Sequence, residues 1–372
     1  MKTNATIEET NSITIDNINV SAYTIPTDLP ESDGTIEWDS TTLVLVEITG
    51  NGKKGIGYTY ADAATAFFID RTLKPLIQGR DTRNSASTTS QLIKGIRNNG
   101  SCGIAMMAVS AVDNALWDLK ARIMGLPLCD LPGCVRENMK LYGSGGFTTY
   151  TGNQTARQFE AWAAQGITHF KMKVGREPDK DLQRVRAARM AIGNAAVLMV
   201  DANGAYTVRQ ALHMADTFAE CGVTWMEEPV SSDDLKGLRF IRDHAPAGCA
   251  IAAGEYGYNL PYFEAMLHAG AVDVLQADAT RCGGISFLLK AGYLCEGHQL
   301  PFSTHCAPSL HLHASLTLPA FSIAEYFHDH VRIESMLFDG VSPPVAGCLK
   351  PDRSRPGLGL EFKHADAKKY KL

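Results

Sequence analysis

The sequence lacks an apolar run that could cross a membrane, because no stretch approaches the roughly 18–20 apolar residues that a spanning helix needs. It also lacks an excess of basic residues, since 35 Lys and Arg are outnumbered by 40 Asp and Glu. The resulting net charge of −5 argues against a surface that binds nucleic acid. Residues 1–12 are polar and acidic without an apolar core, so we expect a disordered leader and not a signal peptide.

Cysteine pairs with the spacing of a redox or zinc site are missing too. The nine cysteines form no Cys-x-x-Cys pair, and their odd number does not suit a framework of disulfides. We therefore expect a reducing compartment and predict a cytoplasmic protein. A chain of 372 residues is long enough for two domains or for one large barrel with an addition.

Seven apolar runs in the middle of the chain each end on a charged or proton-accepting side chain. Successive end residues are 20–28 positions apart, a length that a strand, a helix and two loops fill. An eighth apolar run, residues 139–146, lies upstream and completes the number of strands for a closed barrel. The period predicts a parallel β/α barrel, whose active site forms at the carboxyl ends of its strands. The seven end residues are Lys173, Asp201, Glu227, Glu255, Asp278, His305 and Glu325.

Different patterns flank this array. Upstream, alternating segments that are typical of antiparallel strands precede a long apolar helix, which Gly125 and Pro127 should end. Downstream, the rhythm gives way to a tail rich in Pro and Gly. The predicted parts are an α+β capping domain over 13–135, a barrel over 136–330 and a C-terminal segment over 331–372 that packs back on the capping domain.

Three acids end consecutive runs, with no Cys or His among them. Asp201, Glu227 and Glu255 would be hard oxygen ligands in an open array, which favours Mg²⁺, with Mn²⁺ as a substitute. In one pocket without a cation they would repel one another by several kcal/mol. The alternative is three solvated loop acids. Asn203 is a candidate to support a ligand, whereas strand alternation places Glu228 on the opposite side of its strand.

Proton-transfer groups lie on both sides of these acids. Lys171 and Lys173 share one face of a strand, and like charge with burial would lower a lysine pKa, as an amine base requires. The alternative is a solvated pair at a strand edge. Asp278 and His305 end adjacent runs, and a carboxylate on one imidazole nitrogen makes the other nitrogen a stronger base. Glu325, as a protonated acid, could donate a hydrogen bond to a developing oxyanion.

The motifs KMK, VDANG, MEEP and GE, with the Asp278–His305 pair and Glu325, resemble the mandelate racemase subgroup of the enolase superfamily. The segment SAVDNALWDLKARIMGLPL also resembles the one that joins that family's capping domain to its barrel. The resemblance covers residues 13–372. It implies an α/β fold, a modified (β/α)7β-type TIM barrel with an α+β capping domain completed by the C-terminal tail. It further implies that Asp201, Glu227 and Glu255 bind Mg²⁺, that Lys173 and His305, oriented by Asp278, are two bases, and that Lys171 and Glu325 bracket a substrate carboxylate.

The resemblance also implies a reaction, the abstraction of the proton α to a carboxylate to give an enediolate. We predict dehydration of an acid sugar, an aldonate or aldarate, to a 2-keto-3-deoxy acid. Racemisation, epimerisation or cycloisomerisation of a 2-hydroxy acid or a sugar-acid lactone would use the same residues. A non-catalytic sugar-acid-binding protein would need one of these positions lost, and all are present. Oligomers are usual in the family, which implies a homo-oligomer.

Selectivity should come from the capping domain. A polar flap at residues 24–42 and a second segment at 57–63 are the predicted lid, and their many polar groups suit a polyhydroxylated acid. The alternative for the flap is a solvated, mobile loop. The predicted substrate contacts are Asp28, Trp38 and Tyr60. We expect a small-molecule carboxylate as the partner, with no nucleic acid and no membrane.

Overall fold

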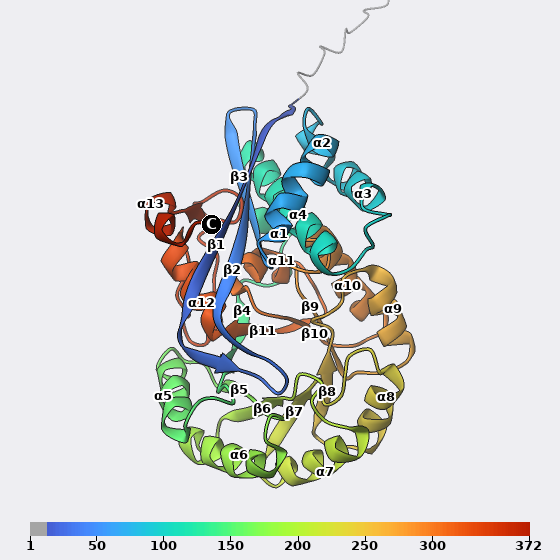
Figure 1. Cartoon of the computed structure of the whole chain (residues 1–372), viewed down its shortest axis with the longest axis vertical. Coiled ribbons are helices and arrows are strands. Elements are labelled where there is room, and N and C mark those ends of the chain that lie inside the picture. Colours follow the sequence, from blue (N-terminus) through green and yellow to red (C-terminus); the bar gives the residue numbers. More distant parts are fainter. Residues whose placement is uncertain (1–12) are drawn as a thin grey trace, which may run out of the picture.

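The computed structural model describes residues 13–372, so the leader predicted at residues 1–12 lies outside the described residues. Eight parallel strands form a closed barrel, because β4 pairs with β11 as well as with β5. The predicted barrel is thereby confirmed (Figure 1). Its strands are β4 (Met139–Gly145), β5 (His169–Lys173), β6 (Val197–Asp201), β7 (Val223–Glu227), β8 (Ala250–Ala253), β9 (Val274–Ala277), β10 (Phe302–Thr304) and β11 (Phe321–Phe327).

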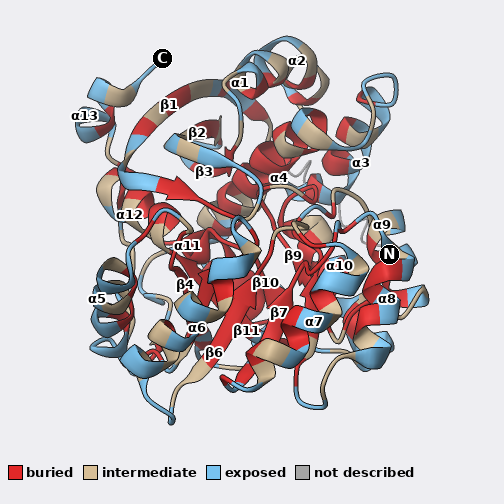
Figure 2. Cartoon of the chain, turned by 60° about the horizontal axis from the view of Figure 1, so that its bottom comes forward, coloured by how far each residue is buried: buried red, intermediate tan, exposed pale blue. Residues whose placement is uncertain are grey.

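Seven helices connect the barrel strands and form its outer layer. Two of them begin with capping boxes, in which Thr151 or Thr207 accepts a hydrogen bond from the backbone three residues ahead. The strands are buried while the helices expose their outer faces (Figure 2), as expected for a parallel sheet covered by helices. The helices are α5 (Gly152–Ala163), α6 (Pro178–Ile192), α7 (Val208–Ala219), α8 (Leu235–His244), α9 (Leu260–His268), α10 (Ile285–Gly297) and α11 (Pro308–Ser315).

The capping domain combines a three-stranded antiparallel sheet with helices, as predicted. Helix α4 lies directly on β3, where glycines replace side chains: a Cβ at Gly57 would lie 2.3 Å from the carbonyl oxygen of Ala111. Gly125 ends α4 in the left-handed conformation, with φ of 68°. The elements of the capping domain are β1 (Ile15–Ser32), β2 (Glu37–Gly50), β3 (Lys53–Tyr60), α1 (Ala64–Phe68), a π-helical turn (Ile69–Leu73), α2 (Lys74–Ile77), α3 (Ser85–Gly95) and α4 (Gly103–Met124).

A buried polar seam joins α4 to the barrel. Asn114 accepts a hydrogen bond from the backbone N–H of Ile285 (2.9 Å) and donates one to the carbonyl of Ala279 (3.0 Å). Asp113 accepts hydrogen bonds from the backbone and the hydroxyl of Ser286 (2.9 and 2.7 Å). These contacts fix the capping domain over the loop that follows β9, one of the loops at the active end of the barrel.

The β1–β2 hairpin extends from the capping domain across the mouth of the barrel (Figure 1). Its tip fits tightly, because a Cβ at Gly34 would lie 2.4 Å from the carbonyl oxygen of Ala202 and 2.7 Å from that of Val174. Thr148, in the loop after β4, donates its backbone N–H to the carbonyl of Ser32 (2.9 Å). The hairpin therefore covers the ends of β4, β5 and β6.

The C-terminal residues contact both parts of the protein. Strand β13 (Cys348–Leu349) extends the barrel sheet beside β4, and β14 (Glu361–Phe362) pairs with β12 (Phe338–Asp339). Helix α12 (His328–Leu337) contains the boundary predicted at residue 330, and a short α13 (His364–Ala367) follows. Within residues 13–372 no helix combines the length and the apolar character needed to cross a bilayer.

Candidate active site

Three carboxylates meet at the carboxyl ends of neighbouring strands. Asp201 and Glu227 are the last residues of β6 and β7, and Glu255 follows β8 by two positions. One oxygen from each lies within 4.8 Å of the others, and all three side chains are buried. The structure thus brings together the three acids that the strand period placed at one level.

The two predicted lysines lie on β5 and contact these acids. Lys171 Nζ lies 2.5 Å from Glu227 Oε1 and 2.8 Å from Glu325 Oε1, and Lys173 Nζ lies 2.5 Å from Asp201 Oδ2. Burial is the largest single influence and would lower the pKa of Lys173, but Asp201, Glu255 and Glu325 together outweigh it, and the pKa lies above its usual value. The expectation of a lowered lysine pKa is therefore wrong for this arrangement, because opposite charge lies nearer than like charge.

Glu325 differs from expectation for the same reason. Burial favours its protonated form, but Lys171, with His305 and Lys173 nearby, holds its pKa well below the usual range. Its other oxygen, Oε2, accepts a hydrogen bond from the backbone N–H of Cys306 (2.8 Å). Glu325 is thus ionised here and not the protonated donor that we expected.

His305 follows β10 and is paired with an acid, as predicted. Its Nδ1 lies 2.8 Å from Asp278 Oδ2. Burial opposes ionisation of Asp278, but His305, with His311 and Arg281 nearby, holds the pKa of this carboxyl below its usual value. The second ring nitrogen, Nε2, lies 3.5 Å from Glu255 Oε2 and 3.8 Å from Glu325 Oε2. The imidazole therefore presents Nε2 to the carboxylates at the strand ends.

The carboxylate cluster fits a divalent cation. Among the residues that the structure describes, the buried space holds four carboxyl groups but only two lysines, so two carboxylates have no lysine to neutralise them. The acids are Asp201, Glu227, Glu255 and Glu325, and the lysines are Lys171 and Lys173. Burial raises the pKa of Glu227 well above its usual value, although Lys171 opposes the shift. Glu255 Oε2 is buried and has no hydrogen-bond partner within residues 13–372. Hard, unpaired oxygen donors in this arrangement are what Mg²⁺ prefers.

A cavity of about 390 Å³ lies between the strand ends and the capping domain. Lys173, Glu255 and His305 line it from the barrel, whereas the wholly buried Lys171 is not among its lining residues. Trp38 and Tyr60, two of the three residues predicted to contact substrate, line it from the capping domain. The sequence did not single out Arg281, whose Nη1 lies 3.5 Å from Glu255 Oε1. Its place three positions after Asp278 was the available signal.

The predicted flap is ordered structure and carries buried acids. Asp28 is not among the residues that line the cavity, and its carboxylate lies 3.1 Å from His328 Nε2. Glu31 is buried and accepts a hydrogen bond from the indole N–H of Trp38 (2.9 Å). Asp33 is also buried and accepts hydrogen bonds from its own turn. These contacts argue against the alternative of a solvated loop for this part of the hairpin.

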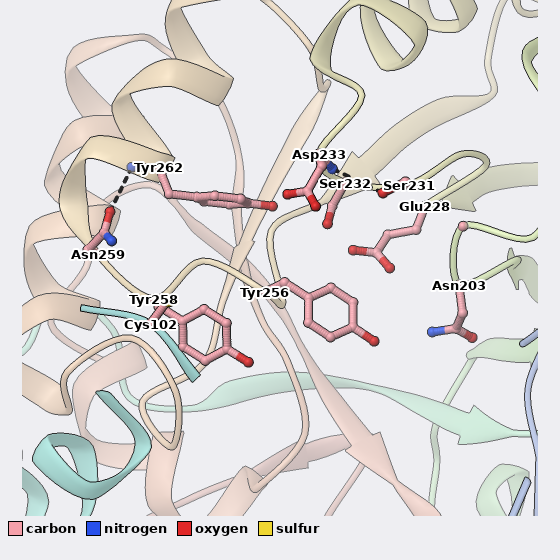
Figure 3. A pocket seen from close by; sticks show the side chains of 11 residues that line it. Cys102, Asn203, Glu228, Ser231, Ser232, Asp233, Tyr256, Tyr258, Asn259 and Tyr262 are labelled. Atoms are coloured by element: carbon pink, nitrogen blue, oxygen red, sulfur yellow. Dashed lines mark hydrogen bonds between the residues drawn. The ribbon is translucent and has the colours of Figure 1, made fainter. Parts of the chain in front are cut away.

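A second cavity, of about 560 Å³, adjoins the first and shares Asn203 and Tyr256 with it (Figure 3). The Asn203 backbone N–H donates to Asp201 Oδ1 (3.0 Å), so this residue supports a carboxylate of the cluster. Glu228 points into the second cavity, although strand alternation placed it on the opposite side. Its φ of 38° ends the strand geometry and turns the side chain.

Two further buried residues lie beside the Asp278–His305 pair. His311 is buried in α11, where its Nε2 accepts the backbone N–H of Ala279 (2.8 Å), which supports packing. Cys306 lines the cavity, and its Sγ lies 3.2 Å from His305 Nε2. Burial raises the pKa of this thiol well above its usual value, so it stays protonated.

Comparison with known proteins places this site in a family. Residues 21–133 match the mandelate racemase / muconate lactonizing enzyme N-terminal domain, and residues 154–367 match the enolase C-terminal domain-like family. The chain is 32% identical to L-talarate/galactarate dehydratase of Salmonella typhimurium over 296 residues, which cover 77% of this chain and 73% of that protein. It is 31% identical to 3,6-anhydro-α-L-galactonate cycloisomerase of Streptomyces coelicolor over 364 residues, 94% of this chain and 98% of that protein.

Solved structures agree with these matches. A mandelate racemase/muconate lactonizing enzyme-like protein from Rubrobacter xylanophilus superposes with a TM-score of 0.95 at 52% identity, covering 96% of this chain and all of that one. L-talarate dehydratase from Polaromonas sp. JS666, complexed with magnesium and L-glucarate, superposes with a TM-score of 0.87 at 29% identity, covering 97% and 98%. The chain therefore belongs to the mandelate racemase/muconate lactonizing enzyme family, within the enolase superfamily.

Proposed function

We propose that this protein is a Mg²⁺-dependent acid-sugar dehydratase that removes the proton α to a carboxylate and then eliminates the β-hydroxyl as water. One observation carries the proposal: Lys173 and the Asp278-bound His305 line the same cavity, beside a buried cluster of three carboxylates. The acid-sugar substrate is supported by the relative whose structure holds magnesium and L-glucarate.

The cation would be held by Asp201, Glu227 and Glu255, with Mn²⁺ as a possible substitute for Mg²⁺. When bound, the ion supplies positive charge that favours the doubly negative, enolised form of the substrate carboxylate over the substrate itself. Lys171 and Glu325 contact each other at 2.8 Å behind the lining of the cavity, so the buried ammonium group would add positive charge at that end of the site.

His305 and Lys173 would transfer the protons. Because Asp278 accepts the hydrogen bond from Nδ1, the neutral imidazole carries its lone pair on Nε2, the nitrogen nearer the carboxylate cluster. His305 follows β10 and Lys173 ends β5, so the two groups reach the cavity from opposite sides of β6–β8. One base on each face of the α-carbon is the arrangement that both elimination and inversion need.

Dehydration breaks two bonds of the substrate, the α C–H bond and the C–O bond at C3. The α C–H bond breaks and its proton passes to His305 or Lys173. The bond between C3 and the β-hydroxyl then breaks, and the hydroxyl takes a proton from the conjugate acid of the same or the facing base to leave as water. The resulting enol takes up a proton at C3 and releases the proton of its C2 hydroxyl, which gives the 2-keto-3-deoxy acid.

The test is a screen of mono- and dicarboxylic sugar acids with Mg²⁺, in which semicarbazide detects 2-keto acids. In parallel, incubation in deuterated water followed by NMR reports exchange of the α-hydrogen. We expect keto-acid formation from at least one sugar acid. A library that yields neither keto acid nor exchange would contradict the proposal and would favour a non-catalytic binding protein.

Cycloisomerisation or epimerisation is the second candidate. It is favoured by the 31% identity to a sugar-acid cycloisomerase over 94% of this chain. The same residues would act, but a proton would return to carbon and no water would leave. Exchange of the α-hydrogen without keto acid would therefore identify an isomerase.

A further inference from the structure

The capping-domain wall of the 390 Å³ cavity contains acids and hydroxyls but no basic side chain, among the lining residues that the structure describes. Asp33 and Asp62 supply the carboxylates, and Ser40, Thr41 and Thr42 supply hydroxyls. Asp62 is exposed and uses Oδ1 to accept the backbone N–H of Ala64 (2.8 Å). A substrate held at the strand ends by its reacting carboxylate would direct its other end toward this wall.

The two cations that line the cavity lie on the barrel side and are already paired with acids. Lys173 Nζ contacts Asp201 Oδ2 at 2.5 Å. Arg281 lies 3.5 Å from Glu255 and 3.9 Å from Asp278, and its guanidinium stacks over Tyr256 at 5.2 Å. Both cations therefore lie on the barrel side beside acids, and neither belongs to the capping-domain wall.

His330, in the first turn of α12, is a neutral donor that lines the same cavity beside Tyr60. Its Nδ1 accepts the backbone N–H of Ala307 (3.3 Å), so the proton of the neutral ring lies on Nε2. The ring stacks on Tyr60 with centroids 3.5 Å apart, and burial lowers its pKa to about 3. Nε2 has no hydrogen-bond partner among the described residues, and His330 lines the cavity.

We infer that this enzyme prefers acid sugars with one carboxylate, the aldonates, over the dicarboxylic aldarates, and that His330 donates its Nε2–H to a hydroxyl of the distal chain. The inference rests on the proposed function and specifies its substrate class. A terminal hydroxyl can accept from His330 and donate to an acid such as Asp62. A terminal carboxylate would meet like charge without a compensating cation, which opposes binding.

Paired substrates test the inference. Each six-carbon aldonate is assayed beside the aldarate with the same configuration at C2 to C5, with keto-acid formation and α-hydrogen exchange both measured. We expect kcat/KM for the best aldonate to exceed that for its paired aldarate by at least about 100-fold. An equal or higher value for the aldarate would overturn the inference and leave the proposed function intact. Absence of both reactions throughout the panel would instead reject the proposed function, and the inference with it.

Charge reversal on the wall gives a second test. The substitution Asp62→Lys places a cation at the distal end and should raise kcat/KM for the aldarate by about tenfold. The matched control is Asp39→Lys, because Asp39 is exposed on β2, the strand that pairs with β3 just before Asp62, and is not among the lining residues. The same rise in both variants, or in neither, would contradict the inference.

The role of His330 is tested by His330→Phe, which keeps an aromatic ring against Tyr60 and removes the donor. We expect KM for the aldonate to rise about tenfold while kcat stays nearly constant, because the lost contact lies away from the reacting carbon. A loss of kcat alone would show that His330 acts on the chemistry and would remove it from distal recognition. Circular dichroism checks that the variant keeps its fold.

Discussion

His305 illustrates how single residues acquire their function here. Asp278 holds Nδ1 at 2.8 Å, and the positive φ values of Cys306 (52°) and Ala307 (36°) turn the chain sharply just after the ring. Non-glycine residues with such φ values cost free energy, and they persist where the surrounding structure imposes them. The turn therefore fixes His305 between β10 and α11, with Nε2 at the carboxylate cluster.

Removing either base should abolish most of the turnover. We expect His305→Asn and Lys173→Ala each to lower kcat by about 10²–10⁴, the range that a positioned acid or base contributes. The measurement is initial rates of keto-acid formation on the best substrate, with thermal unfolding to confirm the fold. His298→Asn is the matched control, because His298 is exposed on the far end of α10. Unchanged kcat in either base variant would remove that residue from the mechanism.

The identity of the site residues could be predicted from sequence, but their charge states could not. An acid or base at the end of each apolar run was enough to place Asp201, Glu227 and His305 at one level. The ionisation of Lys173 and Glu325 depends on which neighbours lie within 3 Å, and sequence spacing does not give such distances. The orientation of Glu228 depends on one backbone angle, which the pattern of alternating side chains assumes to be extended.

At the scale of elements, the β1–β2 hairpin decides how the cavity is closed. Replacing Gly34 by alanine should lift its tip, because the new Cβ would overlap carbonyl oxygens of the β5 and β6 loops. We expect Gly34→Ala to lower kcat/KM by at least about tenfold, because closure of a lid over the substrate completes the site. The secondary structure of the barrel should change little. Steady-state kinetics and circular dichroism measure the two effects.

The control for this variant is Gly52→Asn in the β2–β3 turn. A Cβ there meets nothing within 4 Å, and asparagine tolerates the φ of 66°. Its kinetics should match those of the unmodified protein. Equal kinetics for Gly34→Ala would show that the hairpin tip does not need its close contact with the barrel.

Glu31 makes the same hairpin sensitive to pH. Burial, with Asp329 nearby, raises the pKa of Glu31 to about 9, against about 4.3 in an unfolded chain. Its stabilising contribution is complete below the unfolded pKa and is lost as pH rises toward 9, because the folded state then holds a proton that the unfolded state has released. Glu31→Gln should therefore reduce the loss of stability between about pH 5 and 9.

Thermal unfolding at several pH values measures the slope of stability against pH. The expected result is a variant that is more stable than the unmodified protein at pH 8, with a smaller difference at pH 5. Glu37→Gln, on the exposed part of the same hairpin, is the control and should leave the slope unchanged. A slope in Glu31→Gln equal to that of the unmodified protein would show that Glu31 is already ionised when folded.

Some secondary-structure elements could be predicted from the sequence and others could not. Buried parallel strands give short apolar runs at a regular period, so the barrel strands were predictable. The two-residue strands β12, β13 and β14 were not, because pairs that short carry no periodic pattern and form only through distant partners. Helix α12 was missed for a related reason, since the helix starts directly after β11 with no loop between them.

At the scale of the whole molecule, we expect both stability and activity to depend on the bound cation. Treatment with a chelator should abolish turnover, and Mg²⁺ should restore it. A cation that binds only the folded state adds about 2.7 kcal/mol at a hundred times its Kd, so Mg²⁺ should raise the Tm of chelator-treated protein. Asp201→Asn should lose most of this rise. Full activity of metal-free protein would contradict the role of the three acids.

The last residues of the chain have a practical consequence for work at the bench. The backbone N–H of Leu372 donates a hydrogen bond to the carbonyl of Ala22 (3.0 Å). Lys371 forms an isolated antiparallel β-bridge with Tyr23 in β1. An affinity tag fused behind Leu372 would thus emerge against the root of the flap, and trimming a few terminal residues would loosen it. Expression vectors for kinetic studies should accordingly carry the tag at the opposite end of the polypeptide.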